Sequence, residues 1–287
     1  NEALFFIRNC TQFSRTLKRF PNQVNHIAFR KFLNDENKTV MFIGESHFYE
    51  TDITQKMVKV YMDFYNSFKK ITGMVIDLFI EIEHIRDDQN MEYRYDSEFY
   101  VNIFNSLKDS EHVRLHKIDY RGDPFIDQFQ QFVDYIKDAH SGEYINVDLH
   151  TVHTYLKMGR DLISGKNFTI NFPLLIKQYK KINKFNLLIK LYLHFFRNPF
   201  NKIQYLIKDI QRYWAFGNRK KPGEKIALFK KIHENIIISD SNYLLQVNAR
   251  FMDLYTIGRM LKPGYNYCVL YAGSFHTYSI MKTLEKY

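Results

Sequence analysis

The stretches TVMFIGESH, residues 39–47, and YCVLYAGSFH, residues 267–276, decide the fold of this chain. In each, an apolar run typical of a buried strand leads into Gly-x-x-His, whose glycine makes a tight turn before a helix opens. The carboxyl ends of parallel strands meet at one edge of a sheet, the usual position of sites in open α/β sheets. We therefore expect both histidines at that edge, in a catalytic or metal site built from the two ends of the chain.

Two further apolar runs, residues 74–80 and 113–119, predict additional buried strands. Helical spacing of apolar residues predicts helices over residues 54–70 and 98–107. Each of these helices lies between two successive predicted strands. Alternation of strand and helix is typical of βαβ units and a parallel sheet. The predicted fold class is thus α/β, a mainly parallel sheet flanked by helices, with residues 267–280 supplying a central strand and its helix.

The middle of the chain has no strong strand pattern. Residues 125–235 are predicted to form a large, basic helical insertion between the N- and C-terminal sheet elements. The α/β core that carries the site would then consist of residues 1–124 and 236–287. Within this core, residues 1–35 and 236–265 are also predicted to be helical.

Positive charge is concentrated in that insertion. The whole chain has a formal net charge of +10, whereas residues 177–231 hold twelve Lys and three Arg but only two acids, a net charge of +13. Such a segment predicts an anionic membrane or an acidic partner, through residues 174–231. A nucleic acid is disfavoured because no DNA- or RNA-binding motif is present. The apolar residues that alternate with Lys over 174–192 either face a membrane or pack on the core of an ordinary helical subdomain.

Composition suggests a soluble protein. The longest apolar stretches are shorter than the roughly 20 residues of a membrane helix, and no secretory signal pattern is present. Two cysteines, Cys10 and Cys268, make no disulfide framework and favour a reducing compartment.

Because the chain begins with Asn1, we expect that it has been trimmed. Abundant Phe, Tyr, Asn and Lys indicate an AT-rich genome, such as that of some bacteria, protists or large DNA viruses.

The first Gly turn carries Glu45 and His47. His47 could act as a general base or a metal ligand, with Glu45 as a second base, a ligand or an orienting group. The structural alternative is a helix cap, in which Ser46 caps the helix and Glu45 complements its dipole. A second Gly-x-x-His, ending in His276, favours the functional interpretation because the fold brings the two turns together.

Carboxylates follow the other two strands. Asp77 lies within the second apolar run, where it needs a cation or hydroxyl as partner, and Glu81 and Glu83 come just after that run. We choose Glu81 as the ligand or base and expect it beside the first strand's turn, with Glu83 a solvated loop acid. Asp119 ends the third run and could hold a ligand or fix an imidazole tautomer, or could simply initiate a turn.

The long helix near the C-terminus contributes one charged pair. Arg250 and Asp253 are three residues apart and share a helix face. Arg250 could stabilise a developing anion at the site. An ordinary salt bridge on the helix surface explains the same spacing.

These residues resemble the erythromycin-esterase, ChaN and TIKI/TraB superfamily. Its hallmarks are an N-terminal Gly-Glu-x-His or Gly-x-x-His turn, an acid after the next strand, an Arg-bearing helix and a C-terminal Gly-x-x-His. Gly44 to His47, Glu81, Arg250 and Gly273 to His276 match them in order, over about residues 39–122 and 245–287. The basic insertion lies outside the resemblance.

The resemblance implies hydrolysis in several branches. TIKI-like members are divalent-metal proteases, esterase-like members activate water with His and Glu, and a toxin branch cleaves host GTPases. ChaN-like members bind haem instead, so the fold alone does not determine the reaction. By this analogy a divalent metal (Mn, Co or Zn) would be bound by His47, His276 and Glu81, and haem is the less favoured cofactor.

Two functions follow as hypotheses. The first is a hydrolase of a peptide, protein or ester that activates water with His and Glu, directly or through a metal. The second is a non-catalytic module, a large-virus structural protein or the anchoring domain of a toxin, which keeps the fold and binds its partner through the basic insertion. The first needs His47, His276 and a carboxylate together in a cleft. The second needs exposed basic and apolar groups over residues 174–231.

Overall fold

The computed structural model of the chain forms two compact units. One consists of Asn1–Gly122 with Tyr255–Tyr287, and the other of Asp123–Leu254. Each unit is described separately. The residues that the structure describes are 2–32, 38–46, 51–71, 73–83, 98–119, 157, 173–197 and 249–286.

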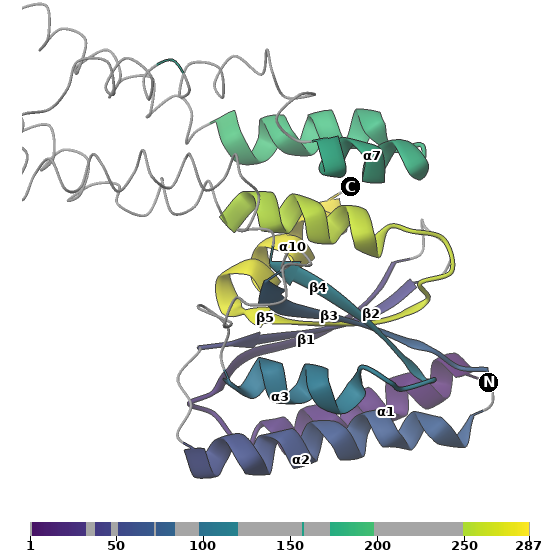
Figure 1. Ribbon diagram of the computed structural model, residues 1–287, viewed down its shortest axis with the longest axis vertical. Helices are drawn as coiled ribbons and strands as arrows, with labels where there is room; N and C mark the ends of the chain where they lie inside the picture. Colours follow the sequence, from purple (N-terminus) through teal and green to yellow (C-terminus); the bar gives the residue numbers. More distant parts are fainter. Residues whose placement is uncertain are drawn as a thin grey trace, which may run out of the picture. The chain divides into compact units, whose positions relative to one another are not determined.

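The first unit is built from a five-stranded sheet and its flanking helices (Figure 1). Its strands are β1 (Val24–Phe32), β2 (Lys38–Glu45), β3 (Ile76–Glu83), β4 (Val113–Asp119) and β5 (Tyr267–Gly273). Its helices are α1 (Glu2–Leu17), α2 (Thr51–Ser67), the 3-10 turn η1 (Phe68–Lys70), α3 (Glu98–Leu107) and α10 (Ser274–Lys286). Residues 249–260 form a further helix, of which the part from Tyr255 onward belongs to this unit.

The strand order is β1-β2-β5-β3-β4. The four strands β2, β5, β3 and β4 are parallel, and only β1 runs antiparallel, against β2. This mixed, mostly parallel sheet confirms the α/β class. The predicted central strand, β5, lies between β2 and β3, so Glu81 does not adjoin the first strand's turn directly, as we had expected. The predicted insertion falls mainly outside the described residues.

One predicted helix is wrong. Residues 24–32, placed in a helix over residues 1–35, form β1, which pairs with β2 from Val24 opposite Glu45 to Phe32 opposite Lys38. Ile27 and Phe29 point into the core two residues apart, as a strand requires. Their spacing relative to Phe32 also fits a helix. The strand forms instead because its backbone pairs with the outer edge of β2, whose hydrogen-bonding groups a helix would leave unpaired.

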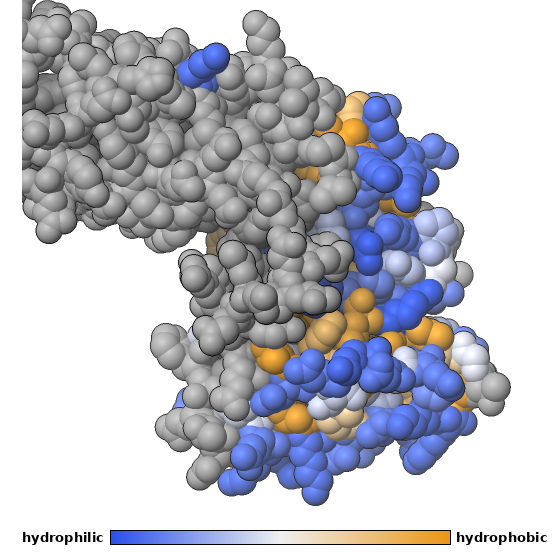
Figure 2. All heavy atoms as spheres, in the orientation of Figure 1, coloured by the Kyte–Doolittle hydropathy of each residue, from blue (hydrophilic) through white to orange (hydrophobic). Residues whose placement is uncertain are grey.

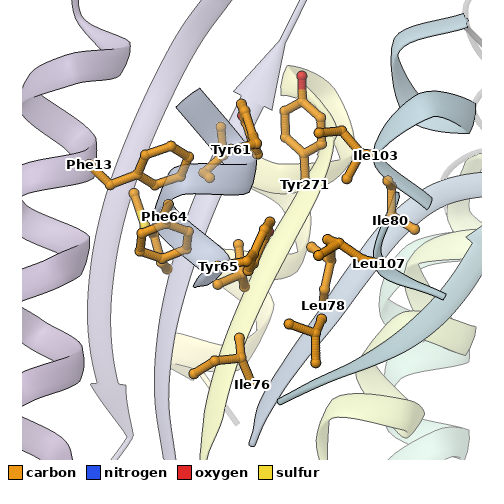
Figure 3. Close-up of a cluster of buried hydrophobic side chains, with 14 of the residues drawn as sticks. Phe13, Tyr61, Phe64, Tyr65, Ile76, Leu78, Ile80, Ile103, Leu107 and Tyr271 are labelled. Carbon is orange, nitrogen blue, oxygen red and sulfur yellow. The ribbon is translucent and has the colours of Figure 1, made fainter. Parts of the chain in front are cut away.

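A core cluster of buried residues lies between one face of the sheet and the helices α1, α2 and α3, which Figure 1 shows below the sheet. It is rich in aromatic rings: Phe13 stacks on Phe64 with centroids 4.0 Å apart, and Tyr61 lies 4.9 Å from Tyr271 of β5 (Figure 3). Such pairs add about 0.5–1.5 kcal/mol each to the free energy gained by burial. The central strand is therefore held from below by aromatic contacts as well as by its two neighbours.

The opposite face of the sheet is covered by α10, which packs on β2 and β5. Gly44, near the end of β2, permits this packing. A Cβ atom at that position would lie 2.9 Å from the Cα of Ser274 and 3.2 Å from the Cβ of His26. The glycine that the sequence suggested for a turn is thus required for the close approach of β2 to the first turn of α10.

The second unit is described over α7 (Pro173–Lys181), a helix at residues 185–197 and the start of the helix at residues 249–260. The Tyr179 hydroxyl donates to the carbonyl oxygen of Leu254 at 2.8 Å, and the Phe196 ring lies 4.6 Å from Phe251. These contacts show an internal core in the described part of this unit.

The described helices include none long and apolar enough to span a membrane. On the face drawn in Figure 2, the described residues are mainly hydrophilic, and apolar atoms form small patches between them.

The Gly44→Ala variant tests the packing of β2 on α10. We expect the free energy of unfolding to fall by about 1–3 kcal/mol, because the new methyl group forces the backbone of Ser274 to move. Urea unfolding followed by circular dichroism measures the change. Gly73→Asn is the control: Gly73 has φ of 83° and open space around it, a conformation that Asn tolerates, so its cost should be about 1 kcal/mol or less. Equal costs for the two variants would contradict the interpretation.

Candidate functional site

Three of the predicted site residues come together at the carboxyl edge of the sheet. Glu45 ends β2, Glu81 lies near the end of β3, and His276 lies in the first turn of α10. Register explains the convergence: Glu45 is paired with Gly273, the last residue of β5, and Ser274 begins the helix directly after it. The strand at the centre of the sheet thus delivers His276 to the edge where the two glutamates stand.

Glu81 anchors this end of the sheet. Its Oε2 accepts a hydrogen bond from the backbone N–H of Gly273 at 2.7 Å, and its Oε1 lies 3.9 Å from Nε2 of His276. The second distance is too long for a hydrogen bond but allows electrostatic attraction. A carboxylate at the start of α10 is also stabilised by the helix dipole. Glu81 therefore serves as a helix cap and as the group that faces the imidazole.

Glu45 is almost fully buried, with 2% of its surface exposed, among tyrosines. The Tyr271 hydroxyl donates to its Oε2 at 2.7 Å. Burial, followed by the charges of Glu45 and Glu81, raises the pKa of Tyr100 well above its usual value. Burial together with nearby Tyr61 and Glu45 does the same to the pKa of Tyr271. Tyr100 and Tyr271 therefore stay protonated and uncharged at any physiological pH. Their hydroxyl groups add no negative charge next to the Glu45 carboxylate.

The remaining predicted residues are placed as follows. His47 lies outside the described residues. Asp119 is buried at the end of β4, and its backbone is in register with Glu83. Arg250 and Asp253 belong to the second unit, where Nη1 of Arg250 donates to Oδ2 of Asp253 at 2.8 Å. They form the ion pair that their spacing allowed, but Asp253 is fully buried, so the pair is not an exposed one on the helix surface.

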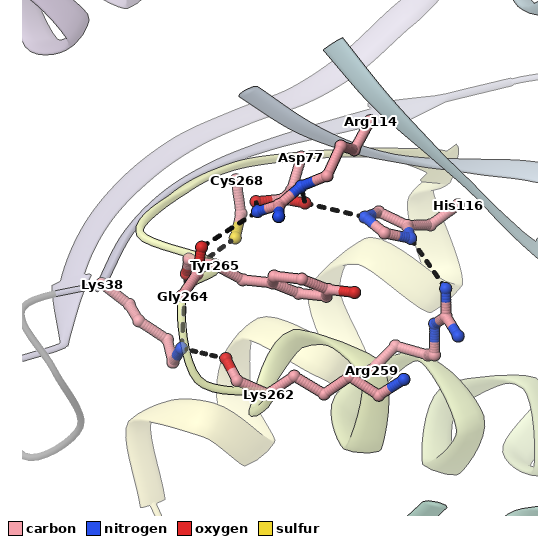
Figure 4. A network of polar contacts seen from close by, with 9 residues as sticks. All are labelled: Lys38, Asp77, Arg114, His116, Arg259, Lys262, Gly264, Tyr265 and Cys268. Carbon is pink, nitrogen blue, oxygen red and sulfur yellow. Dashed lines mark hydrogen bonds and ion pairs between the residues drawn. The ribbon is translucent and has the colours of Figure 1, made fainter. Parts of the chain in front are cut away.

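Asp77 has the partners that its burial requires, but at a different place in the sheet (Figure 4). Arg114 of β4 binds both its carboxylate oxygens at 2.8 Å, and Nε2 of His116 lies 2.8 Å from Oδ1. Arg259 donates to Nδ1 of the same imidazole at 2.8 Å. Asp77 is fully buried, so this fork of two hydrogen bonds and the imidazole compensate its loss of water.

These contacts define the protonation state of His116. Because Nδ1 accepts from Arg259, the proton resides on Nε2 and is donated to Asp77, as in a neutral imidazole. Burial lowers the pKa of His116, and the charges of Arg259 and Arg114 lower it further against the opposing effect of Asp77. The ring also stacks on Phe79, with centroids 4.6 Å apart. His116 is therefore locked in orientation and tautomer.

Sequence reasoning missed Arg114, His116 and Arg259. A signal was present in Arg114-x-His116, two polar residues on one face of a run predicted to be buried. Their partner Asp77 stands at the equivalent level of the neighbouring strand, since it is in register with Arg114. Arg259 had no such signal, because only the tertiary structure brings its helix to β4.

The part of the chain that the structure describes does not supply a complete set of metal ligands. Glu81 and His276 supply two suitable groups, but no cluster of three or more His, Cys, Asp and Glu side chains that could hold an ion is found there. Catalytic zinc sites usually have three protein ligands. The predicted metal site therefore depends on His47, which lies outside the described residues.

Most of the described apolar residues that alternate with Lys in the second unit are buried, whereas the lysines themselves are not. Leu175, Tyr179, Leu188 and Tyr192, four of the apolar residues that alternate with Lys, belong to the buried core. Two apolar side chains on the helix of residues 185–197 are exposed, Ile189 at 36% and Leu193 at 59%. In the described part of the second unit, these apolar residues therefore mainly pack inward.

Comparison with known proteins does not identify this chain. No family model, no curated protein and no solved structure matches it. Functional inference therefore depends on the site itself.

Removing the hydroxyl group of Tyr271 tests how Glu45 is held. Tyr271→Phe takes a hydrogen bond from a buried carboxylate, so we expect the free energy of unfolding to fall by about 1–3 kcal/mol. The matched control is Tyr65→Phe, since the Tyr65 hydroxyl is buried without a hydrogen-bond partner among the described residues. Its removal should change stability by less than about 0.5 kcal/mol, or increase it. Chemical denaturation of both variants distinguishes them, and an equal loss would count against the assignment.

His116 is expected to make stability depend on pH. Because its pKa is lowered in the folded chain, the unfolded chain binds a proton first as pH falls below about 6.5. The free energy of unfolding should fall from pH 7 to pH 5, and less steeply in His116→Gln, whose amide does not titrate. Urea unfolding at both pH values measures the two slopes. His112→Gln, outside the network, should keep the wild-type slope; equal slopes for His116→Gln and wild type would refute the assignment.

Proposed function

We propose that this protein is a hydrolase of ester or amide bonds that activates water at the carboxyl edge of the sheet in the first unit. The observation that supports the proposal is the convergence of Glu45, Glu81 and His276 from β2, β3 and α10. His276 is the most accessible of the three, with 13% of its side chain exposed against 5% for Glu81. It is therefore the group that can meet a substrate.

In the proposed reaction, neutral His276 takes a proton from a water molecule as the water oxygen attacks the carbonyl carbon. The carbonyl oxygen becomes an oxyanion, which collapses and expels the leaving group; that group receives the proton from the imidazolium. Glu81 stabilises the imidazolium, and the Gly273 N–H keeps the carboxylate in place. The 3.9 Å separation would shorten when substrate binds, as such contacts often do.

Glu45 has a positioning role in this proposal. It is buried and accepts a hydrogen bond from Tyr271, so it adds negative charge at the edge without contacting the substrate. The roles inferred by resemblance for His47 as base or metal ligand, and for Arg250 as the group that stabilises the anion, stay predictions. So does membership of the erythromycin-esterase, ChaN and TIKI/TraB superfamily, with a divalent metal as cofactor and a peptide, protein or ester as substrate.

The alternative proposal is a non-catalytic module that binds an anionic membrane or an acidic partner through residues 174–231. One observation favours it. Ile189 and Leu193 lie one turn apart on their helix, both exposed, next to exposed Lys190. Apolar and basic groups so combined are typical of helices that lie on a membrane. A folded protein that cleaves neither esters nor peptides would favour this alternative.

A hydrolysis screen tests the catalytic proposal. We expect the full chain to cleave members of a panel of chromogenic esters and fluorogenic peptides. In Glu81→Gln and His276→Ala, kcat/KM should fall by about 100-fold or more, because each variant removes the proton transfer or its stabilisation. His112→Ala is the control, since His112 lies at the amino end of β4; it should retain activity. Circular dichroism checks that each variant folds.

A second arm of the screen addresses the metal. Activity lost on chelation and restored by Mn, Co or Zn would support a bound cation that lowers the pKa of water. Activity that survives chelation would support the direct route through His276. Hydrolysis that is unchanged in both site variants would contradict the proposed site.

A further inference from the structure

A second feature of the first unit lies away from the carboxyl edge. It is a pocket of about 360 Å³ at the edge strand β4, lined by Phe104, Lys108, Leu115, His116, Lys117, Tyr255 and Arg259. All seven residues belong to the first unit. Glu45, Glu81 and His276 do not take part in it, so its function is separate from the proposed hydrolysis. Its volume lies within the range of small-molecule sites, about 300–1,000 Å³.

The lining of this pocket is positively charged. Three of the residues are Lys108, Lys117 and Arg259, and none of the seven is acidic. A concave site lined mainly by groups of one sign concentrates the field and attracts ions of the opposite sign. The pocket therefore has the electrostatic character of an anion site.

Arg259 makes the strongest case. Its Nη2 donates to the neutral imidazole of His116, and its Nε is buried without a hydrogen-bond partner in the described part of the chain. No ion pair with Arg259 is formed by the described carboxylates, and Asp77, on the far side of His116, is bound by Arg114 and His116. A partly buried guanidinium without a counter-charge costs free energy, which a bound anion would recover.

The Asp77 network explains why Arg259 stays in place without that anion. Asp77 holds His116 in the tautomer whose Nδ1 accepts from Arg259 (Figure 4). Stacking on Phe79 fixes the imidazole plane. The guanidinium is thus oriented by a neutral acceptor, which leaves its positive charge available.

Aromatic walls complete the pocket. Phe104 lies beneath the ammonium group of Lys117, with Nζ 4.7 Å from the ring centroid, and Tyr255 is nearly buried. A ligand that fills such a pocket combines an anionic group with a flat or apolar part. Among common anionic groups, phosphate has the charge and the number of acceptor oxygens to engage two lysines and one arginine at once.

We propose that this pocket binds the phosphate group of a small soluble molecule, with a flat or apolar remainder against Phe104 and Tyr255. Lys108, Lys117 and Arg259 bind the phosphate oxygens. Asp77 and His116 position Arg259, and His116 is also part of the lining of the pocket.

Isothermal titration of the full chain with phenyl phosphate tests the proposal. We expect a Kd below about 1 mM, weaker binding of inorganic phosphate, and none of phenol. Lys108→Met and Lys117→Met should each raise the Kd of phenyl phosphate about tenfold, as loss of a charge-assisted hydrogen bond predicts. Arg259→Gln, which removes the guanidinium charge, should raise it at least as much. The matched control is Lys69→Met, which removes an exposed charge of the same unit outside the pocket and should leave the Kd unchanged.

Several results would overturn the proposal. One is no binding of phenyl phosphate up to about 10 mM, where a site of this affinity would be nearly saturated. Another is equal weakening in Lys69→Met and Lys117→Met, which would indicate diffuse attraction. A third is binding to vesicles that contain phosphatidic acid without binding of the soluble ligand. Hydrolysis by the carboxyl edge is measured separately, so either proposal can fail alone.

Discussion

The pairing of β5 between β2 and β3 is the constraint on which the rest of the first unit depends. This central strand comes from the last part of the chain, whereas both its neighbours come from the first third. Its register with β2 brings Gly273 beside Glu45, and the helix that follows packs against Gly44. Without this strand, the two glutamates and His276 would have no common edge.

The sheet carries two clusters of charged side chains, and the hydrogen-bond partners of the charged groups differ between them. At the carboxyl edge, Glu45 and Glu81 are held by neutral donors, a tyrosine hydroxyl and a backbone N–H. At β4, Asp77 is matched by Arg114, and Arg259 is oriented by a neutral imidazole. The first place therefore retains negative charge and the second retains positive charge. Opposite charges suit them to different chemistry, a proton acceptor at one and an anion at the other.

Sequence reasoning found the parallel strands because long apolar runs before Gly turns have few other structures open to them. It also predicted that Glu45, Glu81 and His276 lie at one edge of the sheet, as they do, because the carboxyl ends of parallel strands share one edge. It failed at β1, where the spacing of Ile27, Phe29 and Phe32 fits a helix or a strand, and the free edge of β2 selects the strand. It assumed that Glu81 adjoins the first turn, although β5 separates the two strands.

The sequence by itself determined the α/β class and the central position of the last strand, since these depend on local apolar pattern and on the polarity of the chain. Only the tertiary structure decided which side chains of neighbouring strands and helices contact one another. It paired Asp77 with Arg114 and His116, placed Arg259 beside that imidazole, and surrounded Glu45 with tyrosines from two helices and β5. Contacts between residues more than a hundred positions apart depend on strand order, and local spacing carries no information about that order.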